Sequence, residues 1–168
     1  MGAGYHGGFG TTYGGVRFAA GDLTYKSEPE LFFEYAAKRK LIDPDGMIDI
    51  VAHGTKNTIQ LVINGNTMNV TARFLARMLK HSMKYGKKQE IRLVSCNTGR
   101  DDFGFAQQLA NKLNVNVLAP TRKYLAADDG SYIVAGTIKI GNKEYVDNND
   151  IGYMKLFKPG GAFKKWNV

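Results

Sequence analysis

Two side chains of this chain can act together as a nucleophile and a base. His53 directly follows the apolar run Met47–Ala52, and Cys96 directly follows the run Ile91–Ser95. A thiolate attacks carbonyl carbons, and a neighbouring imidazole both favours the thiolate and transfers the proton. Cys96 is the only cysteine, and no His-x-His or His-Glu-x-x-His spacing is present, so we expect neither a metal site nor an intramolecular disulfide, and no cofactor is implied.

The two residues are expected to meet because each ends a buried strand. If these strands are parallel neighbours, His53 and Cys96 emerge at the same carboxyl edge of the sheet, where open α/β folds place their sites. We expect the His53 ring and the Cys96 sulfur to lie within several ångströms of each other, in a site that is partly open to solvent. Burial of Cys96 in a closed core would end the peptidase interpretation. The backbone N–H groups of Gly54 and Cys96 are the predicted oxyanion donors.

The residues after Cys96 are candidates for binding the substrate. The carboxylate of Asp101 is a candidate for binding a basic side chain of the substrate, and the guanidinium of Arg100 is a candidate for binding an acidic one. The predicted substrate-binding residues are Asn97, Thr98, Arg100 and Asp101. The alternative for Asp101 and its neighbour Asp102 is that one of them caps the helix that follows.

The two blocks resemble those of peptidase clan CD, which includes caspases, gingipains, clostripain and the self-cutting cysteine protease domains of large bacterial toxins. In that group a hydrophobic strand precedes His-Gly, as in residues 48–54, and a second one precedes a small residue and Cys, as in 91–96. The segment Cys96–Gly99 resembles the Cys block of CHAT domains. The resemblance covers about residues 47–120 and implies a caspase-like fold and a His–Cys dyad, formed by His53 and Cys96, with no obligatory third member.

A second, looser resemblance is to the C-terminal toxin modules of bacterial polymorphic toxins, because the domain is small and basic with a Gly-rich entry. It implies delivery from the producing bacterium into the cytoplasm of a target cell. It also implies a cognate immunity protein as a partner besides the protein substrate.

The elements that position these residues alternate between strand and helix. A helix is predicted from Ser27, as its cap, to about Arg39, and a hairpin over 58–70 turns at Asn64-Gly65. A second helix over 71–84 has Phe74, Leu75, Met78 and Leu79 facing inward and stops at Gly86. A third helix of about twelve residues begins at Asp101 or Asp102, and a strand over 115–119 follows it. Antiparallel hairpins are predicted over 124–135 and 137–146.

This order predicts an α/β fold with a mainly parallel, caspase-like sheet flanked by helices and antiparallel hairpins in the C-terminal third. The 168 residues are enough for one domain. Eight glycines among the first 22 residues predict a linker or arm over 1–22, before a single catalytic domain over 23–168. No apolar run is long enough to span a bilayer, and the first residues do not form a signal peptide.

The basic charge leaves other functions open. Lys and Arg number 23 against 15 Asp and Glu, for a net charge of +8. Such a surface suits nucleic acid, an acidic partner or an anionic membrane, and we expect nucleic-acid binding to be weak and nonspecific because no base-reading motif is present. The prediction is a cysteine peptidase. The alternatives are a nuclease-type toxin that uses His53, a Cys–His deamidase or transglutaminase, and a non-catalytic caspase-like binding module.

Overall fold

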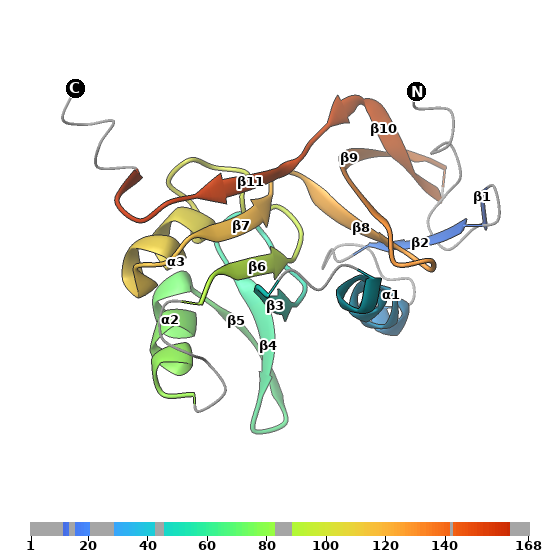
Figure 1. Ribbon diagram of the computed structural model, residues 1–168. Coiled ribbons are helices and arrows are strands. Elements are labelled where there is room, and N and C mark those ends of the chain that lie inside the picture. Colours follow the sequence, from blue (N-terminus) through green and yellow to red (C-terminus); the bar gives the residue numbers. More distant parts are fainter. Residues whose placement is uncertain are drawn as a thin grey trace.

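The computed structural model describes residues 12–13, 16–20, 29–42, 46–82, 89–141 and 143–161. Its helices are α1 (Pro29–Ile42), α2 (Ala72–Lys80) and α3 (Phe105–Leu113) (Figure 1). Its strands are β1 (Thr12–Tyr13), β2 (Val16–Ala20), β3 (Ile48–Val51), β4 (Ile59–Ile63), β5 (Asn66–Val70), β6 (Ile91–Val94), β7 (Val117–Pro120), β8 (Lys123–Ala127), β9 (Tyr132–Ile140), β10 (Lys143–Ile151) and β11 (Met154–Phe157). The chain is therefore mixed α/β, as predicted.

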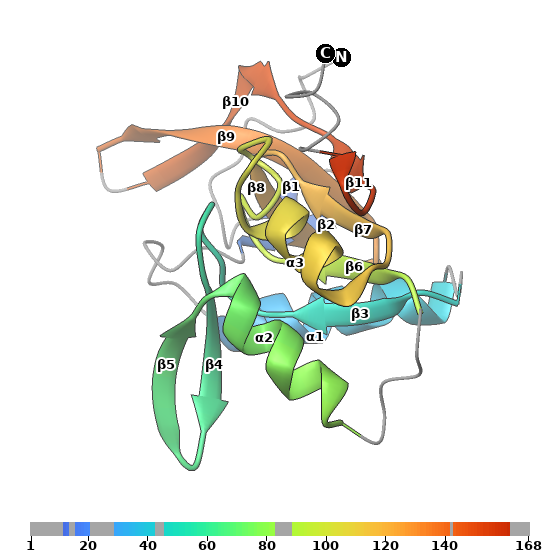
Figure 2. The same ribbon diagram turned by 90° about the vertical axis from the view of Figure 1, so that its left-hand side faces the viewer.

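The predicted parallel strands form one four-stranded sheet in the order β11-β7-β6-β3. Strands β3, β6 and β7 run parallel, and β11 is antiparallel to β7. Continuous apolar runs are typical of strands that are covered on both faces. One face packs against α2 and α3 through a core that includes Leu93, Leu75 and Leu109, and the other face packs against α1 through Val94 and Phe32 (Figure 2).

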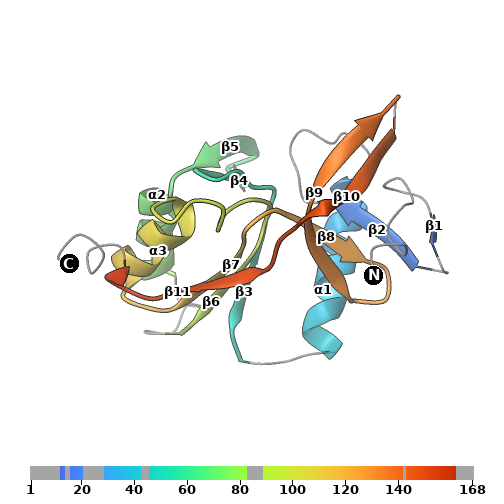
Figure 3. The ribbon, with the colours of Figure 1, turned by 90° about the horizontal axis from the view of Figure 1, so that it is seen from above.

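The C-terminal third and the N-terminal strands make a second, antiparallel sheet in the order β1-β2-β8-β9-β10. The two predicted hairpins share the long strand β9. Strand β7 leads into β8 and β10 leads into β11, so the two sheets are joined where these strands bend (Figure 3). At this bend Thr121 and Tyr153 exchange two hydrogen bonds of 3.0 Å.

Two features of the ends of the chain differ from the expectations. Strand β2 lies inside the segment expected as a linker and pairs with β8, with Phe18 opposite Ala127. Strand β11 was not predicted, because its residues mix Lys with apolar side chains and indicate an irregular tail. The predicted cap Ser27 and the stop Gly86 lie outside the described residues.

The second and third helices are shorter than predicted. Thr71 caps α2, and its side chain accepts a hydrogen bond from the N–H of Phe74. Helix α3 begins at Phe105 with Gly104 as its N-cap, so the capping role predicted for Asp101 or Asp102 is wrong. Phe74 and Met78 were also predicted to face inward, but both are exposed.

The β4–β5 hairpin forms a two-stranded sheet of its own. Asn64 and Gly65 both adopt positive φ, of 50° and 78°, as a tight two-residue turn requires. The hairpin and α2 both point toward the lower end of the molecule in Figures 1 and 2, and Figure 2 shows that they diverge from each other. Among the described residues, no helix is long and apolar enough to cross a membrane.

Candidate functional site

The register of β3 against β6 brings the two candidate catalytic residues to the same level of the sheet. Asp49 lies opposite Arg92, and Val51 lies opposite Val94. The N–H of Ala52 donates to the carbonyl of Val94, which carries the pairing past the end of β3. Because side chains alternate between the two faces of a sheet, the next pair on the face covered by α1 is His53 and Cys96. The predicted adjacency of these two strands is thereby confirmed.

Gly54 allows the two strand ends to approach closely. A Cβ at this position would lie 2.8 Å from the carbonyl oxygen of Cys96 and 3.0 Å from the Cβ of Ser95. Gly54 also bridges to Ile59, but the hydrogen bonds of that bridge use the carbonyl of His53 and the N–H of Thr55. These bonds do not use the N–H of Gly54, which was predicted as an oxyanion donor.

His53 lies under two aromatic side chains of α1. Its ring stacks on Phe32 with 5.7 Å between centroids, and the ring of Phe33 meets it edge to face at 5.3 Å. The residue is 9% exposed. Its Nδ1 atom is buried and has no hydrogen-bond partner among the described residues. A buried ring nitrogen without a partner is costly in a purely structural histidine, so this atom needs an explanation.

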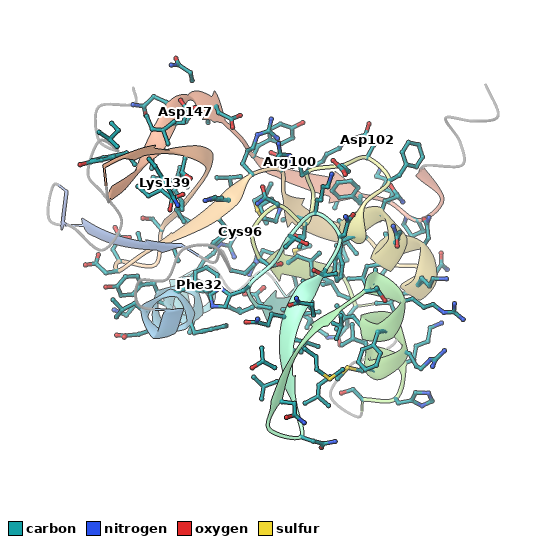
Figure 4. The ribbon with its side chains drawn as sticks, turned by 180° about the vertical axis from the view of Figure 1, so that it is seen from behind. Phe32, Cys96, Arg100, Asp102, Lys139 and Asp147 are labelled. Carbon is teal, nitrogen blue, oxygen red and sulfur yellow. The ribbon has the colours of Figure 1, made fainter. Side chains whose placement is uncertain are left out.

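Cys96 is fully buried, which corrects the expectation of a site that is partly open to solvent. In this closed arrangement the thiol cannot meet a substrate, so a peptidase requires the cover over Cys96 to move. Cys96 belongs to an apolar cluster that includes Phe32, Tyr35 and Tyr124. Figure 4 labels Cys96 and Phe32. The Sγ of Cys96 accepts a hydrogen bond from the N–H of Tyr124 at 3.3 Å, and the carbonyl of Tyr124 lies 3.7 Å away. The burial was not predicted because the cover comes from α1 and β8, which are distant in the chain.

A buried ion pair joins β3 and β6 on the face of the sheet that carries His53 and Cys96. The Arg92 guanidinium lies 2.7 Å from the Asp49 carboxylate, and both side chains are almost fully buried. This pair was not predicted, although the sequence carries a signal for it. Asp49 and Arg92 occupy the same place in the two apolar runs, directly after Ile48 and Ile91. Opposite charges at matched positions of two buried strands favour the register that is observed.

Tyr124 closes the cluster on the side of β8. Its ring stacks on Tyr132 with 4.8 Å between centroids and meets Phe32 edge to face at 6.2 Å. Burial raises the pKa of Tyr124 far above its ordinary value, although the Arg39 guanidinium opposes this shift. The phenol is therefore neutral over the physiological range.

The predicted substrate-binding residues fall into different environments. Thr98 is fully buried, and its hydroxyl donates to the carbonyl of Ser95 at 3.0 Å, so it holds the loop and is not open to a substrate. Asn97 adopts a positive φ of 63° and donates its N–H to the carbonyl of Arg122. Arg100 is exposed. The Asp101 carboxylate lies 3.7 Å from the Lys56 ammonium, which partly neutralises the negative charge predicted to bind a basic substrate side chain.

The described residues contain no group of three or more His, Cys, Asp or Glu that could hold a metal ion. A cavity of about 310 Å³ lies elsewhere, between the start of α3 and β11, and is lined in part by Phe103, Leu156 and Lys155. Lys155 is paired there with Asp102 at 2.6 Å. None of the residues that line this cavity belongs to the His53 and Cys96 pair.

Comparison with known protein families gives a match over most of the described fold. Residues 22–134 match the model of a family described as "Domain of unknown function (DUF8616)". The chain belongs to this family. The matched segment of this DUF8616 protein contains α1, His53 and Cys96 together, and it ends within β9. No curated protein and no solved structure matches the chain.

Proposed function

We propose that this protein is a cysteine peptidase with a His53–Cys96 dyad, and that the described state is its closed form. The observation that supports this proposal is the register of β3 and β6, which aligns His53 with Cys96 at the carboxyl edge of parallel strands. The unpartnered Nδ1 of His53 adds to it, because a general base needs a ring nitrogen that is not committed elsewhere.

Catalysis in this proposal requires α1 to move away from the dyad. Sγ of Cys96 then attacks the carbonyl carbon of a peptide bond, and the thiol proton passes to His53. The N–H groups of Gly54 and Cys96 bind the oxyanion. His53 gives its proton to the leaving amine as the C–N bond breaks, which leaves a thioester on Cys96. A water molecule activated by His53 then hydrolyses the thioester and restores the thiol.

The small, basic character of the chain supports a role as a toxin effector domain that acts on proteins of a target cell. A cognate immunity protein would be its natural partner in that role. The same dyad acting on a glutamine side chain would release ammonia and leave the backbone intact. Detection of new N-termini in treated proteins, rather than ammonia release, distinguishes a peptidase from a deamidase.

One observation favours a second candidate, a non-catalytic caspase-like binding module. Cys96 is fully buried and its Sγ accepts a backbone hydrogen bond, as expected for a cysteine that serves as a small core residue. In this candidate the fold is retained and the chain acts by contact with a partner. The two candidates differ in whether His53 changes the reactivity of Cys96.

Alkylation of the single cysteine tests both candidates without a known substrate. Iodoacetamide is added to the folded protein over a range of pH, and modification of Cys96 is followed by mass. The buried thiol reacts only through local opening of α1, so the rate is slow; with a working dyad, His53 keeps this reaction going at pH values below about 8.5, the ordinary thiol pKa. His53→Ala moves the rise in rate to higher pH.

His81→Ala is the matched control, because His81 is exposed at the end of α2 and should leave the profile unchanged. If Cys96 reacts only when the protein is unfolded, and equally fast in wild type and His53→Ala, the non-catalytic candidate replaces the peptidase.

A further inference from the structure

Most of the net charge of the chain is concentrated in one segment. Residues 57–89 contain no Asp or Glu, whereas the whole chain has 15 of them. The hairpin of β4 and β5 is uncharged, and the cations begin in α2. The cations of the segment are Arg73, Arg77, Lys80, Lys84, Lys87 and Lys88, which together supply +6 of the net +8.

The uncharged hairpin exposes apolar side chains on both of its faces. Val62 is 73% exposed and lies opposite Thr67, and Met68 is 43% exposed and lies opposite Leu61. Successive residues of a strand point to opposite faces, so Val62 and Met68 project in different directions. Leu61 and Ile63 pack against the core, which fixes the face shared with Met68 as the inner one.

Helix α2 adds apolar and basic side chains in neighbouring stripes. Leu75 and Ala76 are buried against the core, whereas Phe74 and Met78 are each 39% exposed. At 100° per residue, Phe74 and Met78 form one stripe of the outer face, and Arg73, Arg77 and Lys80 form the stripe beside it. The described side chains of α2 and of the hairpin contain no carboxylate that could neutralise these cations.

The tip of the hairpin and the C-terminal end of α2 lie at the same end of the molecule (Figures 1 and 2). This end combines the turn at Asn64-Gly65, the exposed Val62, and the last helical turn with Met78, Arg77 and Lys80. A surface that binds a membrane places apolar side chains in the lipid interface and cations beside the anionic headgroups. The uncharged hairpin tip and the basic face of α2 match these two requirements.

We propose that this end of the molecule, the hairpin tip and the outer face of α2, binds an anionic lipid surface. The exposed Val62 beside an uncharged turn, together with the cations of α2 and the lack of any carboxylate in α2 or the hairpin, complements a surface that is apolar inside and anionic outside, which is an anionic bilayer. The apolar tip also favours lipid over nucleic acid, which would use the cations and leave Val62 in water.

Vesicle co-sedimentation of the full chain tests this proposal. The protein is mixed with vesicles of phosphatidylcholine and phosphatidylserine, and with vesicles of phosphatidylcholine alone. We expect binding only to the anionic vesicles. Arg77→Gln/Lys80→Gln should weaken it about fivefold for each charge removed, and Val62→Asn should weaken it several-fold without a change in net charge.

Two matched variants control for charge and for apolar area. Lys139→Gln/Lys158→Gln removes the same charge from exposed sites elsewhere, and Ile140→Asn alters an exposed apolar residue beside the turn of the β9–β10 hairpin. Both should bind the anionic vesicles like the wild type, and circular dichroism should show that all variants are folded.

Three outcomes would overturn the proposal: no binding to anionic vesicles, equal weakening by the control variants, or binding that is indifferent to Val62→Asn. If a DNA duplex competes fully and Val62→Asn has no effect, the charged end is a nucleic-acid surface. If the vesicles do not bind but an acidic polypeptide does, with Val62→Asn weakening it, the end is a protein-docking surface.

Discussion

The ring of Phe32 lies on the imidazole of His53, with 5.7 Å between their centroids and 29° between their planes. Phe32 is also fully buried against Tyr124 and in the same cluster as Cys96. One side chain of α1 therefore contacts His53 and lies in the cluster that buries Cys96. We expect a reagent to reach Cys96 only after α1 moves.

Truncation of Phe32 should expose the thiol. Phe32→Ala removes a buried ring at a cost of about 3–5 kcal/mol of unfolding free energy, and Phe32→Leu costs less because it fills part of the space. We expect the alkylation rate of Cys96 to rise at least about tenfold in both variants through local opening of α1. Phe33→Ala, which removes a partly exposed ring, should raise it less. The fraction of globally unfolded protein is measured by urea titration. If the alkylation rate of Cys96 only follows that fraction, Phe32 is not what limits access to the thiol.

Loss of either dyad residue should abolish proteolysis. Cys96→Ala and His53→Ala should each be inactive, and the double variant should be hardly worse, because the two residues act as a unit. Cys96→Ser should be nearly inactive, since a hydroxyl is not ionised at neutral pH. Cleavage of target proteins, or growth inhibition, is compared at matched folded concentration.

Cys96→Ala should remain folded. It leaves the N–H of Tyr124 without its sulfur acceptor, which costs about 1–2 kcal/mol. Full proteolytic activity in Cys96→Ala would remove this residue from the mechanism and leave His53 to the hydrolytic alternatives.

The buried pair of Asp49 and Arg92 should respond differently to single and double substitution. Arg92→Met leaves the carboxylate of Asp49 buried without its cation, which should cost about 3–5 kcal/mol of unfolding free energy. Adding Asp49→Leu should recover much of that loss, because no isolated charge remains. Lys155→Met breaks the more exposed pair with Asp102 and should cost at most about 1 kcal/mol. Urea unfolding of the wild type, of these variants and of Asp49→Leu alone measures these differences, and additive effects of the two single substitutions in the double variant would contradict the coupling.

A side chain at Gly54 should disturb the alignment of the two strand ends. The Cβ of Gly54→Ala would lie 2.8 Å from the backbone oxygen of Cys96, so one of the two backbone segments must shift. Gly65→Ala is the comparison, because it meets no atom within 4 Å and is strained only by its φ of +78°. We expect Gly65→Ala to cost about 1 kcal/mol and Gly54→Ala to cost more and to change the alkylation profile of Cys96. An unchanged profile in a stable Gly54→Ala would show that this contact does not set the site.

Tyr124 should make the protein sensitive to alkali. Its pKa is raised by burial in the folded state, whereas in the unfolded chain it lies near 10. The stability that depends on the neutral phenol is therefore fully present below pH about 10 and is lost as pH rises toward the folded-state pKa. Tyr124→Phe should lose less unfolding free energy between pH about 9 and 11 than the wild type does. Tyr153→Phe, at an exposed position, should lose as much as the wild type.

Local patterns in the sequence were enough to predict the two parallel strands that carry His53 and Cys96. The runs 48–51 and 91–94 are mostly apolar, so both had to lie in a covered parallel sheet, and the helix between them made them neighbours. Asn64-Gly65 specified the hairpin because a two-residue turn needs positive φ at both positions. These predictions succeeded because each depends on the backbone preferences or burial of a short segment.

Only the tertiary structure decided which elements cover these two strands. Periodicity indicates that Phe32 lies on the apolar side of its helix, but its contact with His53 arises from the packing of α1 against strands far away in the chain. The same limit explains Phe74 and Met78, which have the spacing of a buried face yet are exposed because the hairpin and the core do not extend over them. Burial of a side chain depends on which distant elements fold over it, and that choice is made by the whole chain and not by the segment that carries the residue.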